Sequence, residues 1–114
     1  MHEIRYSAEF NRDYIKLRRR ADRGEGEAKY LIELISKATA KLAENTEAGR
    51  KIQHRLWPKE YIRKYDLKSL WKLNLDSNWR LIYSITGNQA QLFLIYIECM
   101  NHKEYGRKFG YKTG

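Results

Sequence analysis

The apolar residues of this chain change their spacing once, from steps of three and four residues to steps of two. One apolar stripe with helical spacing covers residues 10–21, and a second covers residues 28–42. From residue 67 onward apolar and polar residues alternate, and residues 91–99 are nearly all apolar. Because helices repeat every 3.6 residues and strands every two, this order predicts a helical hairpin followed by a β-sheet.

Cap and turn residues set the limits of these elements. The alternating residues 3–6 predict a short strand, and Ser7 is a good N-cap for the first helix, which Gly24 ends. The turn-forming residues 45–49 end the second helix. Residues 50–66 fit neither period and contain the single proline, so we expect an irregular segment there.

Three strands are predicted at residues 67–75, 79–85 and 91–99, with turns between them. The 114 residues suit one small domain spanning 1–114. The predicted fold is therefore α+β, in the order β-α-α-β-β-β. The helical hairpin covers one face of an antiparallel sheet, which includes the N-terminal strand, and leaves the other face open. Six residues are predicted to be largely buried: Leu31, Ile35, Leu73, Leu81, Tyr83 and Leu94.

Composition excludes several classes of protein. The longest apolar run is residues 92–97, which is too short to span a bilayer, and the N-terminus lacks the apolar core of a signal peptide. We therefore expect a cytoplasmic protein. The single cysteine, Cys99, and three scattered histidines do not supply a ligand set for structural zinc, although Cys99 and His102 have the spacing of half a site. We expect no metal and no cofactor.

The positive charge lies mainly in the second half of the chain. Residues 1–48 carry ten Lys or Arg and nine Asp or Glu, whereas residues 49–114 carry thirteen and five, so most of the net charge of +9 belongs to the second half. Such a field attracts polyanions, including nucleic acids. Many small proteins are basic without binding nucleic acid, so charge alone leaves this question open.

Four residues have the chemistry that metal-independent RNA cleavage needs. Lys72 and Arg80 are predicted on the same polar face of adjacent strands, where their cationic groups can converge on one phosphate. His102 can exchange a proton near neutral pH, and Tyr105 can do so if neighbouring cations lower its pKa. Each residue also has a structural alternative. Lys72 and Arg80 can be solvated cations, His102 a surface residue, and Tyr105 an aromatic that holds the C-terminus on the fold.

Two segments resemble the RelE/ParE superfamily of toxins from type II toxin–antitoxin systems. The first is Leu70-Trp71-Lys72-Leu73-Asn74-Leu75, followed after a turn by Trp79-Arg80-Leu81-Ile82-Tyr83. The second is His102-Lys103-Glu104-Tyr105 with Phe109-Gly110-Tyr111, which is similar to the endings of RelE-like and YafQ-like members. The predicted order of elements is also similar over nearly the whole chain.

This resemblance implies a ribosome-dependent mRNA endoribonuclease that enters the ribosomal A site and inhibits translation without a metal. It also implies an antitoxin partner, with an acidic and partly disordered segment. Carried over by position, Lys72 and Arg80 stabilise the phosphate, and His102 and Tyr105 are candidates for positioning or proton transfer. Asn74 stands where the family often has a second basic residue, and Lys103, Arg107 or His54 are candidates to compensate, with Glu104 a lower-ranked candidate base. Further RNA contacts are expected from Lys68, Asn74, Lys103, Arg107 and Lys108.

Two other functions remain open at this point. ParE-like relatives keep the fold but inhibit DNA gyrase by binding, and the presence of Lys72, Arg80, His102 and Tyr105 argues against that reading. The third possibility is a basic RNA-binding module, for which the sequence contains no recognised RNA-binding signature.

Overall fold

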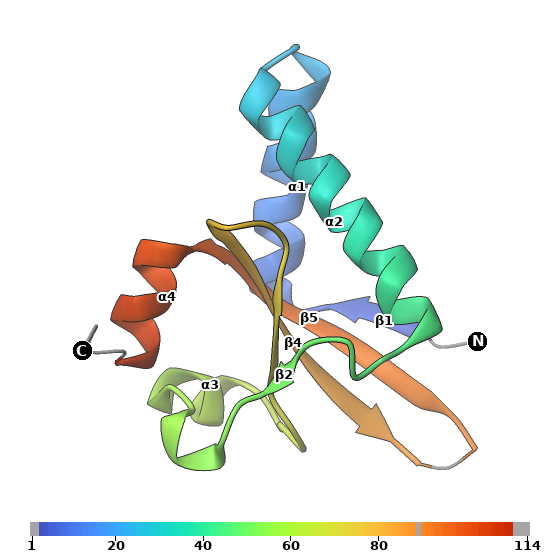
Figure 1. Cartoon of the computed structure of the whole chain (residues 1–114), viewed down its shortest axis with the longest axis vertical. Coiled ribbons are helices and arrows are strands. Elements are labelled where there is room, and N and C mark those ends of the chain that lie inside the picture. Colours follow the sequence, from blue (N-terminus) through green and yellow to red (C-terminus); the bar gives the residue numbers. More distant parts are fainter. Residues whose placement is uncertain (1–2, 89, 111–114) are drawn as a thin grey trace.

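A five-stranded sheet with helices on both faces forms the structure (Figure 1). The computed structural model describes residues 3–88 and 90–110. In chain order the elements are β1 Glu3–Tyr6, α1 Ala8–Asp22, α2 Gly26–Glu44, β2 Arg50–Lys51, η1 His54–Leu56, α3 Lys59–Lys64, β3 Trp71–Asn74, β4 Trp79–Gly87, β5 Leu92–Asn101 and α4 His102–Phe109. The α+β class and the predicted succession of a strand, two helices and three strands are confirmed, with additional short elements.

The strand order is β1-β5-β4-β3-β2. Neighbouring strands are antiparallel except β1 and β5, which are parallel, so the prediction of a wholly antiparallel sheet is wrong. Ser7 holds the junction of β1 and α1, because its backbone N donates to Tyr96 O at 2.9 Å and its hydroxyl donates to Ile97 O at 2.8 Å. The same hydroxyl accepts from Phe10 N at 2.9 Å and caps α1, as predicted. An alternating sequence pattern carries no information on strand direction. The contacts of Ser7 with Tyr96 and Ile97 hold β1 parallel to β5.

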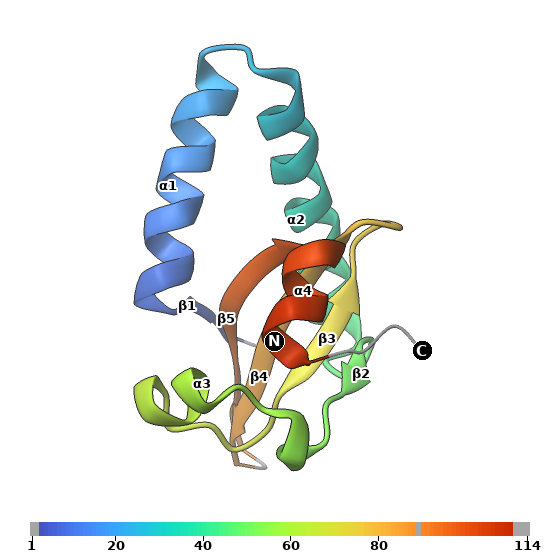
Figure 2. The same cartoon turned by 90° about the vertical axis from the view of Figure 1, so that its left-hand side faces the viewer.

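The α1–α2 hairpin packs on one face of the sheet and forms the larger core. Figures 1 and 2 show this hairpin projecting beyond the sheet, with α3 and α4 placed away from it. All six residues predicted to be buried are at most 7% exposed: Leu31, Ile35, Leu73, Leu81, Tyr83 and Leu94.

The opposite face is not open, which corrects the sequence-based expectation. Tyr61 from α3 and Tyr105 and Phe109 from α4 are buried there against Ile82 and Ile97 of the sheet. The segment expected to be irregular, residues 50–66, contains β2, η1 and α3. The C-terminal segment is mostly polar, so its composition did not reveal that Tyr105 and Phe109, four residues apart, form an apolar pair. This pair faces the sheet when α4 forms.

A β-bulge in β5 determines which side chains share this second face. Ile82 is paired with Glu98 and Tyr83 with Tyr96, so Ile97 is the extra residue of the bulge. Because the side-chain period in a strand is two, one extra residue exchanges the faces of all positions that follow. Met100 therefore lies opposite Arg80 on the second face, and the chain enters α4 on that side.

Gly49 occupies a position where β2 approaches the rest of the sheet closely. A Cβ at this position would lie 2.5 Å from Lys72 O and 2.9 Å from Tyr83 Oη. Gly49→Ala is therefore expected to lower the free energy of unfolding by about 1–3 kcal/mol, as overpacking does. Urea denaturation measures this loss. Gly106→Ala is the matched control, since a Cβ there meets nothing within 4 Å and should stabilise α4 by about 0.5–1 kcal/mol. Equal stability of the Gly49 variant and the wild type would contradict this account.

Candidate active site

Arg80 and His102 are brought together although they are far apart in the sequence. Arg80 Nη2 lies 3.1 Å from His102 Nδ1. A guanidinium is only a hydrogen-bond donor, so His102 Nδ1 accepts this bond and the proton of the neutral ring is on Nε2. The pair thus combines a permanent positive charge with an imidazole N–H that faces away from the arginine.

The turn between β3 and β4 holds the arginine in place. Arg80 Nη1 lies 3.4 Å from the carbonyl oxygens of Asp76 and Ser77. Asp76 Oδ1 accepts from Trp79 N at 2.6 Å and from Asn78 N at 2.8 Å, which fixes the turn. The backbone hydrogen bond from Trp79 is the main cause that lowers the pKa of Asp76, with Tyr30 and the charge of Arg80 acting in the same direction.

His102 is positioned by the start of α4. Asn101 and Glu104 form a capping box, in which Asn101 Oδ1 accepts from Glu104 N at 2.8 Å and Asn101 N donates to Glu104 Oε1 at 3.3 Å. His102 N also donates to Asn78 Oδ1 at 3.3 Å, which ties the helix to the β3–β4 turn. Glu104 therefore has a structural contact at the helix start.

Lys72 and Tyr105 form the second half of the site. The register pairs Lys72 with Ile82 and Asn74 with Arg80, so all four residues share one face and Lys72 is a diagonal neighbour of Arg80. Lys72 Nζ lies 4.9 Å from the centroid of the Tyr105 ring. This ring is only 4% exposed and stacks on Phe109 at 4.5 Å. The ring of Tyr105 therefore acts as a support for the ammonium group of Lys72.

Three further basic residues line a pocket that contains Lys72 and were not among the predicted site residues. An open pocket of about 260 Å³ is lined by Arg50, Lys51, Ile52, Gln53, Arg55, Leu56, Lys72 and Tyr105. Arg50 is directly opposite Lys72 in the pairing of β2 with β3. The sequence signal for these residues was the density of basic side chains at positions 50–55. They lie in a segment with neither a helical nor a strand period, so no face could be assigned to them.

The remaining predicted RNA-binding residues are distributed unevenly. Asn74 is exposed beside Arg80, and Lys103 and Arg107 are exposed on α4. Lys68 is exposed and lies 3.7 Å from Asp66. Lys108 instead contacts carboxylates of the neighbouring elements, with Nζ 2.6 Å from Glu60 and 2.9 Å from Glu98.

The contacts of Lys108 hold α4 against α3 and β5. Tyr61 of α3 donates its hydroxyl hydrogen to Glu98, the same carboxylate that Lys108 contacts. Burial is the main cause that raises the pKa of Tyr61, and the hydrogen bond to Glu98 raises it further. Tyr61 is thus a neutral structural donor at physiological pH.

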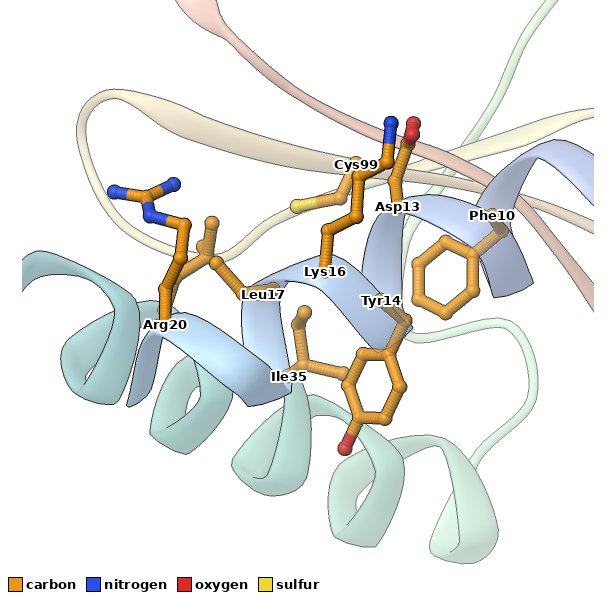
Figure 3. A pocket seen from close by; sticks show the side chains of 9 residues that line it. Phe10, Asp13, Tyr14, Lys16, Leu17, Arg20, Ile35 and Cys99 are labelled. Atoms are coloured by element: carbon orange, nitrogen blue, oxygen red, sulfur yellow. The ribbon is translucent and has the colours of Figure 1, made fainter. Parts of the chain in front are cut away.

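A separate pocket lies between the helical hairpin and β5 (Figure 3). Phe10, Leu17 and Ile35 are among the apolar side chains that line it, and its volume is about 310 Å³. Cys99 also contributes to this pocket, where burial raises its pKa to about 12. The sulfur is therefore a protonated thiol at neutral pH and a poor nucleophile.

Neither a metal cluster nor a membrane span is present in the described part of the chain. No three His, Cys, Asp or Glu side chains within residues 3–88 and 90–110 are arranged to hold a metal ion. No helix in these ranges has the length and apolar character to cross a membrane. Tyr111, part of the second motif, lies outside the described residues.

Comparison with known proteins identifies the family. The family model described as the ParE toxin of the type II toxin-antitoxin system, parDE, matches residues 4–98. The solved structure of a YoeB/ParE toxin from Agrobacterium tumefaciens has a TM-score of 0.57 and 18% sequence identity, with coverage of 88% of this chain and 98% of that chain. A comparison with curated proteins finds no match. The chain belongs to the ParE toxin family of type II toxin–antitoxin systems, within the RelE/ParE superfamily.

The family match has one consequence for the partner of this protein and one for its site. A toxin of a type II system has a cognate antitoxin as its partner. The match ends at residue 98, so it includes Lys72 and Arg80 but not His102 and Tyr105. The functions of the two α4 residues must therefore be argued from their own geometry.

Proposed function

We propose that this toxin is a metal-independent endoribonuclease that cleaves mRNA on the ribosome and so inhibits translation. The contact of Arg80 with His102 Nδ1 is the main observation in support, since it places a phosphate-binding cation beside an imidazole whose Nε2 carries a proton. Such a pair suits a reaction in which negative charge develops on a phosphate and a leaving oxygen needs a proton.

In the proposed reaction the ribose 2′-oxygen forms a bond to the adjacent phosphorus and the bond to the 5′-oxygen breaks. The 2′-hydroxyl proton passes to solvent or to a group of the ribosome. As Arg80 turns to the bound phosphate, His102 Nδ1 takes up a proton, and the resulting imidazolium donates its Nε2 proton to the departing 5′-oxygen and becomes neutral again. The products are a 2′,3′-cyclic phosphate and a 5′-hydroxyl. Arg80 and Lys72 stabilise the charge on the phosphate, and Tyr105 positions Lys72.

The surrounding residues supply the rest of the RNA-binding surface. The pocket beside Lys72 adds Arg50, Lys51 and Arg55, which compensate for Asn74 as the uncharged neighbour of Arg80. An acidic segment of the antitoxin is complementary in charge to this surface, and we propose that it binds there and blocks RNA.

The second candidate is a ParE-like toxin that inhibits DNA gyrase by binding. The matched family model favours it, because that model describes ParE toxins and ends before His102. This candidate requires no proton-transfer group, and the proximity of Arg80 and His102 supports the nuclease instead. The reading as a basic RNA-binding module is set aside, because the chain belongs to a toxin family.

Purified toxin is expected to produce new mRNA 5′ ends on stalled ribosomes and few on the same RNA free in solution. The small site supplies cations and one proton donor, so it relies on the ribosome to orient the strand for attack. Primer extension on programmed ribosomes measures the ends, and a gyrase supercoiling assay with the same preparation is the control. Strong inhibition of supercoiling without new ends would assign the chain to the gyrase inhibitors.

A further inference from the structure

A second open pocket lies next to the one that contains Lys72. It has a volume of about 470 Å³ and is lined by Lys51, Ile52, Gln53, His54, Trp57, Lys68 and Ser69. Lys51, Ile52 and Gln53 also line the pocket beside Lys72, so the two pockets share one wall. A strand bound at Lys72 can therefore extend past β2 into this second pocket.

Two aromatic rings in this pocket are already arranged side by side. The ring centroids of His54 and Trp57 are 4.5 Å apart at an interplanar angle of 51°. Trp57 Nε1 donates to Ile52 O at 3.0 Å, so the polar group of the indole is satisfied within the protein. The fixed ring needs little further ordering to offer its surface to a planar ligand.

Cations flank these rings. Lys51 and Lys68 are both exposed at the pocket, and the contact of Lys68 with Asp66 at 3.7 Å is an exposed pair of small energetic value. Aromatic rings between positive charges are typical of sites for single-stranded nucleic acid, where bases stack and phosphates meet cations.

We propose that this pocket binds an unpaired nucleobase of the RNA strand whose phosphate lies at Lys72 and Arg80. The base stacks on the His54–Trp57 pair, and Lys51 and Lys68 contact the neighbouring phosphates. The inference rests on the proposed nuclease function and adds a subsite to it. Stacking of this kind tolerates any base, so the subsite contributes affinity more than sequence preference.

Fluorescence anisotropy with labelled 2′-O-methyl RNA hexamers tests the subsite, because these RNAs lack the attacking hydroxyl and stay intact. One abasic nucleotide is placed at each position in turn, at low salt. For the wild type, one position is expected to weaken binding about tenfold, in line with the loss of one stacked base. Trp57→Leu should bind the intact hexamer about tenfold more weakly and show no sensitive position. Trp57→Phe should restore both properties.

One further variant tests the second ring of the pocket, and another controls for general effects. His54→Ala removes an exposed ring without touching the core and should reduce the abasic penalty. Tyr6→Leu removes an aromatic that is 41% exposed on β1, at the opposite edge of the sheet, and should bind RNA like the wild type. Thermal unfolding shows which variants are folded.

The possible outcomes separate this inference from the proposed function. The base-pocket proposal is overturned if the wild type binds no hexamer or if no abasic position weakens its binding. It is also overturned if an abasic position weakens binding equally in Trp57→Leu. If that same wild type still cuts mRNA on ribosomes, the nuclease function stands without the pocket. If an abasic position weakens binding only when Trp57 is present, but the toxin cuts no mRNA on ribosomes, the pocket is supported and the nuclease function is overturned.

Discussion

Replacing Arg80 with alanine is expected to slow mRNA cleavage on ribosomes by about 100- to 1,000-fold, the usual effect of removing one group that stabilises transition-state charge. Arg80 is the cation in contact with His102, and the turn carbonyls of Asp76 and Ser77 hold its guanidinium in place. Its loss removes the charge that meets the phosphate and also the donor that fixes the tautomer of His102. Single-turnover primer extension on programmed ribosomes gives the rate.

Two variants make this experiment specific. Arg80→Lys keeps the charge but not the forked donor geometry, so an intermediate rate is expected. Arg63→Ala removes an exposed arginine of α3 outside the site and should leave the rate unchanged. The Arg80 variant should remain folded, because the hydrogen bonds of Asp76 with Trp79 N and Asn78 N fix the turn without the Arg80 side chain. A rate within about threefold of wild type in a folded Arg80→Ala protein would contradict the proposed mechanism.

His102→Ala is expected to lower the cleavage rate by about 100-fold or more, the range for loss of a proton-transfer group, with ribosome affinity nearly unchanged. His102 is exposed at the start of α4, and its backbone rather than its ring makes the contact with Asn78. The variant should therefore keep the helix in place. Added imidazole should restore part of the rate by supplying the missing acid, an effect that a structural role would not produce.

Tyr105→Phe is the contrasting variant, and its rate is expected to stay within about tenfold of the wild type. Phenylalanine keeps the ring surface under Lys72 and the stacking on Phe109, and the residue is nearly fully buried. If Tyr105→Phe lost activity as completely as His102→Ala, the hydroxyl of Tyr105 would have to take part in proton transfer. If both variants cleaved mRNA at the wild-type rate, neither α4 residue would take part in the reaction, and only the basic surface would remain to explain the function.

The helical hairpin and the paired strands were predictable because each follows a local rule. The stripes of α1 and α2 have helical spacing, and Ser7 caps α1 as its side chain suggests. The alternation around Lys72 and Arg80 placed both on one face, and the observed register agrees. The type II toxin assignment also agrees with the family match.

The second face of the sheet was less predictable, although its signals were present. Asn101 and Glu104 have the spacing of a capping box, and Tyr105 and Phe109 are four residues apart. These features indicate a short amphipathic helix, but α4 has only eight residues and many charges. Helices of this length gain most of their stability from packing, so their own sequence is a weak guide.

By itself, the sequence determined the elements that have a local pattern: two helices with apolar stripes, two alternating strands followed by a nearly continuous apolar one, and the common face of Lys72 and Arg80. Only the tertiary structure decided what meets these cations. The bulge at Ile97 depends on how β5 pairs with β4, and it exchanges the faces of the residues that follow. That exchange brings His102 to Arg80 and buries Tyr105 under Lys72. Strand pairing balances contacts between distant segments, so no periodicity within one segment reveals it.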